Sequence, residues 1–67
     1  MNVGSKVIVK DNLIEEVKYG GIMFHHQMSK FRGKEVTIGN IPYKNNPSVV
    51  NVKEDTECYL WSREMFQ

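Results

Sequence analysis

The sequence predicts a mostly β protein, a small barrel of four to five strands with one short helix in its first long loop. Short runs rich in β-branched residues, such as Val7-Ile8-Val9, alternate with turn-forming residues along most of the chain. Residues 22–32 instead repeat their apolar side chains with the period of a helix. The 67 residues form one domain, 1–67, which is too short to fill two layers of a sandwich. Closure into a barrel is therefore expected, because it protects the strand edges.

The first strand is expected over residues 5–10, with Asp11-Asn12 ending it because both side chains can bond nearby backbone groups. Leu13 and Ile14 are expected to anchor the start of the long loop in the core. Further along this loop, Tyr19-Gly20-Gly21 marks a point where the backbone needs unusual dihedral angles or a close approach.

The helix is expected around residues 23–32. Phe24, Met28 and Phe31 stand at positions i, i+4 and i+7, which places them on one face. Gly33 fits the left-handed position that follows a helix end. No Ser, Thr, Asp or Asn occupies a convincing N-cap position, so the start of the helix stays open. A helix of this length must be held by packing.

The clearest strand is expected over residues 34–41, where Val36 and Ile38 share one face. Gly39 then predicts a bulge or a sharp bend before the strand ends. Residues 42–47 begin and end with proline and are expected to form a loop.

A hairpin is expected in the last third of the chain, between a strand over residues 48–53 and a strand over residues 57–61, with a tight turn at 54–56. Val50 and Val52 are expected to point inward.

The chain end is expected to close one end of the barrel. Ser62 is a candidate cap for a last helical turn, and this turn carries Met65 and Phe66 into the opening.

Three stretches together resemble a known group of small barrels. Residues 3–9 are similar to the "vGdkVrV" opening of SH3-like barrels, although Ser5 stands where that opening commonly has Asp. The middle and the end of the chain resemble small phage- and prophage-encoded proteins of this fold, YorP-like in style. The similar segments are Tyr19-Gly20-Gly21-Ile22, Met28, Phe31-Arg32-Gly33-Lys34-Glu35-Val36-Thr37-Ile38 and Tyr59-Leu60-Trp61-Ser62-Arg63-Glu64-Met65. The resemblance implies an SH3-like barrel of mobile-element origin, and it implies no reaction.

Composition excludes several classes of protein. Nine basic and eight acidic residues nearly cancel, so the basic excess typical of duplex-DNA binding is missing. The single cysteine, Cys58, allows no internal disulfide. No signal peptide is expected, because no apolar h-region follows the first residues, and no apolar run approaches the ~20 residues of a transmembrane helix. The protein is therefore expected in the cytoplasm, away from membranes, and the resemblance implies that the cell is a bacterial host.

The residue types that carry chemistry are not arranged for catalysis or for metal binding. Adjacent histidines such as His25-His26 point about 100° apart on a helix, so they rarely share one metal ion. We expect an exposed pair, with a pH-sensitive contact as the alternative. Cys58 is a candidate nucleophile with a histidine as its base, but the neighbouring Glu57 disfavours its thiolate. We therefore expect Cys58 to be a buried or half-buried strand residue. The acidic residues at 15–16 and 54–57 are expected to be solvated. We therefore expect no enzyme, no metal and no cofactor.

The candidate binding surface joins aromatic and basic residues. Lys30, Arg32 and Lys34 form the one basic cluster. Three aromatic residues are candidates to join it: Tyr43, Tyr59 and Trp61. Tyr and Trp are enriched at binding hot spots, and aromatic side chains also stack on single-stranded nucleic acid.

The last strand leaves open which of its faces points inward. Tyr59 and Trp61 share one face, opposite Cys58 and Leu60. Since Cys and Leu are buried more often than Tyr and Trp, the pattern slightly favours an outward aromatic pair. In the alternative, Trp61 is a central core residue.

These observations predict a non-enzymatic protein-binding module. The resemblance implies a phage or prophage accessory protein that modulates or inhibits a host or defence enzyme. The alternative is an SH3-like nucleic-acid-binding protein. The sequence names neither the partner nor the oligomeric state.

Overall fold

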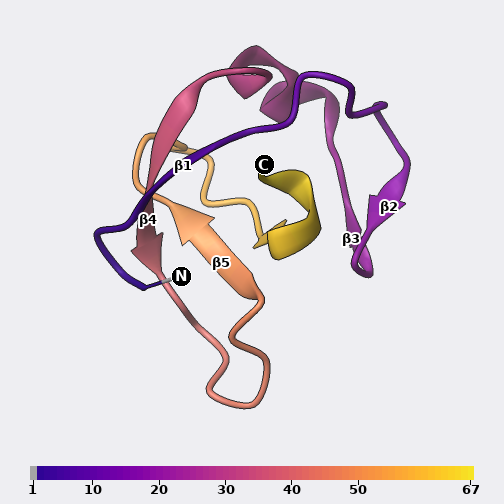
Figure 1. Ribbon diagram of the computed structural model, residues 1–67. Helices are drawn as coiled ribbons and strands as arrows, with labels where there is room; N and C mark the ends of the chain where they lie inside the picture. Colours follow the sequence, from indigo (N-terminus) through magenta and orange to yellow (C-terminus); the bar gives the residue numbers. More distant parts are fainter. Residues whose placement is uncertain (1) are drawn as a thin grey trace.

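The computed structural model describes residues 2–67, which form six short strands and two 3-10 helices (Figure 1). In chain order these elements are β1 (Lys6–Ile8), β2 (Lys18–Tyr19), β3 (Ile22–Met23), η1 (His26–Phe31), β4 (Glu35–Asn40), β5 (Val49–Val52), β6 (Trp61–Ser62) and η2 (Arg63–Met65). Within the described residues, no helix is long and apolar enough to cross a membrane.

One curled antiparallel sheet forms the body of the protein, with the strand order β1-β4-β5-β6. The chain end closes this sheet onto its first strand through an isolated bridge between Val9 and Phe66. Two backbone bonds flank the bridge, from Lys10 N to Met65 O at 2.9 Å and from Gln67 N to Ile8 O at 2.8 Å. The predicted fold class is confirmed: the protein is mostly β, with an SH3-like barrel arrangement and one short helix in its first long loop.

A second, two-stranded sheet lies in that long loop, where β2 and β3 form a hairpin (Figure 1). Gly20 and Gly21 have φ angles of 59° and 84°, and positive φ at both central positions is what a two-residue type I′ turn requires. A Cβ atom at Gly20 would lie 2.8 Å from Glu64 Oε2, so the backbone also approaches η2 closely. The unusual dihedral angles and the close approach predicted at this point are both confirmed.

The hairpin is tied to the barrel by the side chain of Ser62, the last residue of β6. Ser62 stands at the predicted N-cap position of η2, but its side chain makes no capping bond there. Its hydroxyl instead donates a 2.6 Å hydrogen bond to the carbonyl of Tyr19. The predicted role of Met65 and Phe66 is confirmed, because both are buried and close the barrel end.

The interior is apolar and filled by side chains from every part of the chain. The predicted inward positions Val36, Ile38, Val50 and Val52 are all buried. Leu13 is buried as predicted, but Ile14 is 61% exposed, so its predicted role as an anchor is wrong. The backbone N–H of Ile14 donates a hydrogen bond to the hydroxyl of Tyr19, and this bond holds Ile14 at the surface.

The predicted helix exists, but it is shorter and more tightly wound than the apolar spacing indicated. Phe24 N donates to Val17 O at 3.0 Å, which keeps the chain extended beside β2 and delays the helix until His26. Phe24 and Met28 are buried and Phe31 is half-buried. Gly33 has a φ of 73°, as predicted for a residue just past the helix.

The bulge predicted at Gly39 is confirmed by a register shift between Ile38 and Asn40 in the pairing of β4 with β5. A Cβ atom at Gly39 would lie 3.0 Å from Lys53 N, so a side chain there would crowd the backbone of the next strand's end. Here glycine permits close contact between two backbones.

The predicted strand over residues 57–61 is mostly wrong. Its pairing with β5 is present, since Val50 faces Trp61 and Val49 faces Ser62, but only β6 is a strand. Residues 53–60 form a loop because the Asp55 carboxylate accepts hydrogen bonds from the backbone N–H groups of Glu57 and Tyr59, both at 3.1 Å. Donors held in this way cannot take part in a ladder.

Two further expectations for this loop are wrong. Asp55 is 4% exposed and thus is not a solvated carboxylate. Cys58 is exposed, with a φ of 58°, and is not a buried strand residue. Both differences have the same cause, namely the turn that Asp55 imposes on the backbone.

The carboxylate of Glu54, in the same loop, should make the stability of the fold depend on pH. Thr37 donates to Glu54 through its backbone N–H at 2.8 Å and through its hydroxyl at 3.0 Å. The backbone hydrogen bond is the main cause that holds the pKa of Glu54 below its ordinary value of 4.5. Because folding lowers this pKa, the carboxylate stabilises the fold above pH 4.5, and this contribution is lost as the pH falls through the lower folded pKa.

Glu54→Gln should therefore flatten the acid limb of the stability curve. Urea unfolding between about pH 5 and pH 3 should show a smaller loss of unfolding free energy in the variant than in the wild type. Glu57→Gln, which removes an exposed carboxylate of the same loop, is the control and should follow the wild type. Equal slopes for Glu54→Gln and the wild type would contradict this account.

Candidate functional site

The structure does not bring the sequence-predicted binding residues together. Trp61 is 0% exposed and lies in the core, with Phe24, Phe31 and Phe66 around it at ring-centroid distances of 6.2, 5.7 and 5.9 Å. The slightly favoured interpretation, an outward pair of Tyr59 and Trp61, is therefore wrong for Trp61. The large aromatic side chain is buried because its one polar atom has an internal partner: Nε1 donates to Asp55 Oδ2 at 3.0 Å.

Arg32 is engaged within the protein. Its Nε donates to Leu13 O at 2.8 Å, its guanidinium lies 5.2 Å from the centre of the Phe24 ring, and Nη2 lies 4.0 Å from Glu15 Oε2. These contacts hold the long loop against η1, and they use donors that a partner would need. Lys30 and Lys34 are exposed.

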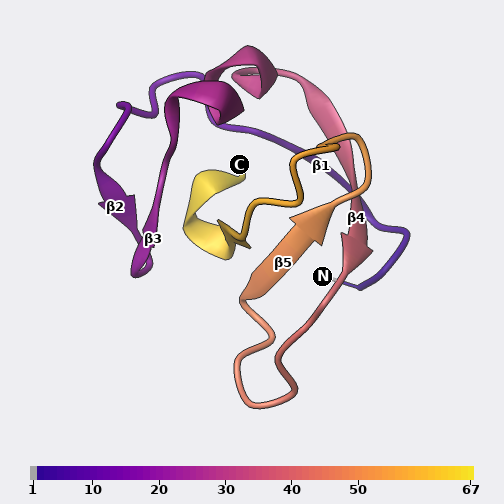
Figure 2. The ribbon, with the colours of Figure 1, turned by 180° about the vertical axis from the view of Figure 1, so that it is seen from behind.

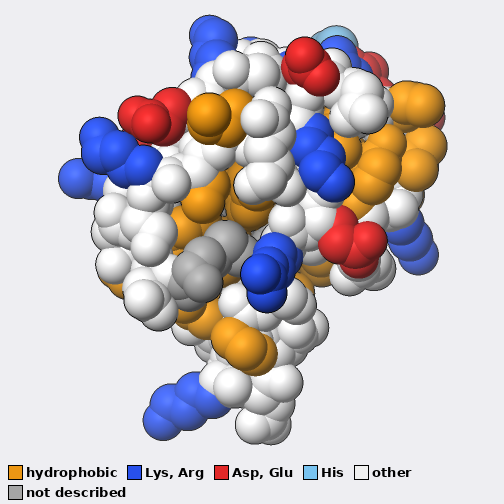
Figure 3. Space-filling model, viewed as in Figure 1, with side chains coloured by type: hydrophobic (Ala, Val, Ile, Leu, Met, Phe, Trp, Pro, Cys, Tyr) orange, Lys and Arg blue, Asp and Glu red, His pale blue; other side chains and the backbone are white. Residues whose placement is uncertain are grey.

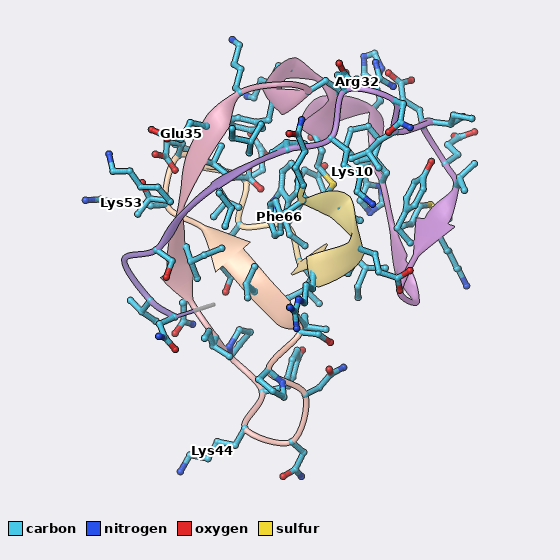
Figure 4. All side chains as sticks on the ribbon, in the orientation of Figure 1. Lys10, Arg32, Glu35, Lys44, Lys53 and Phe66 are labelled. Atoms are coloured by element: carbon cyan, nitrogen blue, oxygen red, sulfur yellow. The ribbon has the colours of Figure 1, made fainter. Side chains whose placement is uncertain are left out.

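Tyr43 is exposed but remote from the other predicted residues. It lies in the loop between β4 and β5, next to Lys44, and this loop projects from the end of the molecule opposite Arg32 (Figure 4). The same view shows Phe66 pointing into the interior. Tyr43 and the basic residues of η1 therefore do not form one surface.

Charges on the face seen in Figure 3 are of mixed sign. Lys and Arg side chains alternate there with Asp and Glu side chains, and no continuous basic area covers this face (Figure 3). Among the described residues, no group of three or more His, Cys, Asp or Glu side chains could hold a metal ion.

The two adjacent histidines have different surroundings. His26 Nδ1 lies 3.1 Å from Glu15 Oε1, and this hydrogen bond is the main cause that lowers the pKa of Glu15 from its ordinary value. His25 stacks on Tyr59, with ring centroids 4.7 Å apart and 27° between the planes. The exposed pair predicted from the sequence is confirmed, since both residues are exposed.

A surface groove lies between the β2–β3 hairpin and the end of the 53–60 loop. Figure 2 shows the backbone of both segments, with the hairpin at the left and the loop that follows β5 running toward the centre of the molecule. Its volume is about 460 Å³. Its lining residues come from the two segments: Lys18, Gly21, Ile22, Met23 and His25 on the hairpin side, and Cys58, Tyr59 and Leu60 on the loop side.

Both walls of the groove are held by specific contacts. Asp55 fixes the loop wall through its bond to Tyr59 N, and Ser62 fixes the hairpin wall through Tyr19 O. The Tyr59 hydroxyl donates to Gln27 Oε1, which joins the loop wall to η1. The stack of His25 on Tyr59 joins the two walls at one end. Hydrogen bonds and a ring stack therefore hold both walls of the groove.

The lining of the groove is mostly apolar and carries no carboxylate. Ile22, Met23 and Leu60 are half-buried, so each offers part of its surface to a partner. Lys18 contributes the one permanently charged side chain. Tyr59 is the only residue of the sequence-predicted binding surface that lines this groove.

The sequence patterns do not predict the other lining residues as part of a binding surface. Residues 22 and 23 were counted toward the helix, although two-residue runs on either side of Gly20-Gly21 are also typical of a hairpin. That hairpin signal was available and would have placed Lys18 opposite Met23, as the structure does.

Comparison with known proteins finds no matching family model, no matching curated protein and no matching solved structure. The class of the protein is therefore defined by its own fold and site: a small SH3-like barrel with an apolar surface groove beside a short hairpin.

Proposed function

We propose that this protein is a non-enzymatic binding module that holds a segment of another protein in the groove between the β2–β3 hairpin and residues 58–60. The observation that carries the proposal is the groove itself, with a volume of about 460 Å³ and a mostly apolar lining, on a barrel whose interior is filled. Grooves lined by apolar and aromatic side chains with few polar groups are typical recognition sites.

The surroundings of the polar residues support binding rather than catalysis. The Asp55 carboxylate accepts hydrogen bonds from the indole N–H of Trp61 and from two backbone N–H groups, so its acceptor sites are occupied within the fold. His26 is paired with Glu15 at the surface, away from the groove lining. These polar groups are therefore engaged within the protein, and the groove offers a partner mainly apolar surface.

The biological setting of the proposal comes from the resemblance to phage- and prophage-encoded barrels. In that setting the protein acts in the cytoplasm of a bacterial host cell, and its partner is a host or defence enzyme that it modulates or inhibits.

The experiment begins with affinity purification from a bacterial lysate, with and without nuclease, and proceeds to the purified partner. Leu60→Glu places a charge in the groove, and we expect it to weaken binding at least tenfold. Ile22→Glu tests the opposite wall in the same way. Binding is measured by calorimetry, and circular dichroism checks that each variant is folded.

Two control variants separate the groove from the surface predicted in the sequence. Tyr43→Ala, at the far end of the molecule, and the double variant Lys30→Glu, Lys34→Glu, beside η1, should bind like the wild type. Loss of binding in the double variant but not in folded Leu60→Glu would overturn the proposal. Capture that nuclease abolishes would favour nucleic acid as the partner instead.

A further inference from the structure

One edge of the β2–β3 hairpin carries unpaired backbone groups. Tyr19 and Ile22 are partners next to the turn, and Phe24 N donates to Val17 O. Between these bonded positions, Lys18 and Met23 form the partner pair that exchanges no hydrogen bonds. The N–H and C=O groups of Met23 therefore point away from β2. They have no other hydrogen-bond partner within the described residues.

Residues of this edge line the groove. Ile22, Met23 and His25 lie on the β3 side of the hairpin wall, and residues 22–25 at about 3.3 Å per residue cover roughly 10 Å. A stretch of about four extended residues spans that distance. An extended segment placed here can exchange two backbone hydrogen bonds with Met23 and direct alternate side chains toward Ile22 and Leu60.

The charge of the lining indicates which side chains suit the site. Lys18 lies opposite Met23 in the hairpin, so its side chain emerges on the same face of the two strands. No carboxylate lines the groove to neutralise it. An acidic residue of a partner would complement Lys18, whereas a basic one would be repelled.

We infer that the partner segment is an extended acidic–apolar peptide that adds a strand to the Met23 edge of β3, with an apolar side chain in the groove and a carboxylate beside Lys18. This inference rests on the proposed function and specifies its partner class. Main-chain bonds supply affinity in this mode, and the groove and Lys18 supply specificity.

The test uses synthetic chains of all 67 residues and a displayed library of random octapeptides. Selected sequences are synthesised, and their dissociation constants are measured by fluorescence anisotropy. We expect the selected peptides to combine an acidic residue with apolar residues two positions apart. A chain with N-methylmethionine at position 23 lacks the outward N–H but keeps the side chain, and it should bind these peptides at least tenfold more weakly.

Matched controls isolate each part of the inference. N-methylation of Lys44, whose backbone N–H has no hydrogen-bond partner within the described residues, makes the same chemical change at the far end of the molecule and should leave the affinity unchanged. Lys18→Glu should weaken binding about tenfold at low salt and less at high salt. Lys44→Glu, at the far end of the molecule, should have no effect.

The outcomes separate this inference from the proposed function. Peptides that lose affinity with Leu60→Glu but not with N-methylmethionine at position 23 would overturn strand addition and leave the groove as the site. Selected peptides without acidic residues would overturn the charge assignment. If no peptide binds, or if folded Leu60→Glu binds normally, both proposals fail.

Discussion

Replacing Trp61 by alanine is expected to unfold most of the protein at room temperature, rather than to remove a contact with a partner. The side chain is fully buried, and three phenylalanine rings pack around it. Truncating a buried Trp costs about 3–5 kcal/mol. A domain of this size has a total stability of only about 3–5 kcal/mol, so the loss is comparable to the whole.

Urea unfolding followed by circular dichroism measures this effect, and two variants serve as controls. Tyr43→Ala removes an aromatic ring that is 52% exposed and should change the unfolding free energy by less than about 0.5 kcal/mol. Trp61→Phe keeps most of the apolar volume but removes the Nε1 donor, so it should lie between the other two. A folded Trp61→Ala protein with near-native stability would show that Trp61 is not the centre of the core.

Replacing Asp55 by alanine is expected to destabilise the fold by about 3 kcal/mol, because one buried carboxylate serves three donors. Hydrogen bonds to charged groups contribute about 1.5–3 kcal/mol each, and they are not additive within one network. The substitution also leaves Nε1 of Trp61 buried without an acceptor, which costs about 1–3 kcal/mol.

The same substitution should release the loop wall of the groove, because Tyr59 N loses its acceptor. Hydrogen exchange at Tyr59 and Leu60 would report that release, and urea unfolding would report the stability. Glu57→Ala, an exposed carboxylate of the same loop, is the matched control. A double-mutant cycle of Asp55→Ala with Trp61→Phe should show a coupling of about 0.5–3 kcal/mol, and additivity would contradict a direct bond.

Most of the fold could be predicted from the sequence because the signals are local. Val36, Ile38, Val50 and Val52 alternate with polar residues, and this alternation indicates which face of each strand is buried. Gly39 predicts the bulge because a glycine inside a strand is a local signal for one.

The candidate site could be predicted only in small part, since Tyr59 alone was identified. The groove depends on two segments, 18–25 and 58–60, that are remote in the chain. Their approach follows from single long-range bonds, such as that of Ser62 to Tyr19 O, for which the sequence carries no period or motif.

The sequence by itself therefore determined the fold class, the core faces of the main strands and the position of the glycines that permit turns. Only the tertiary structure decided how much of residues 57–61 forms a strand and whether Trp61 is buried. Alternation left two faces of residues 57–61 nearly equal, and local patterning cannot rank them. The buried Asp55 decides between them, because its carboxylate takes two backbone donors out of the ladder and accepts the indole N–H. That arrangement turns Trp61 into the core and leaves Tyr59 and Leu60 to form the wall of a groove.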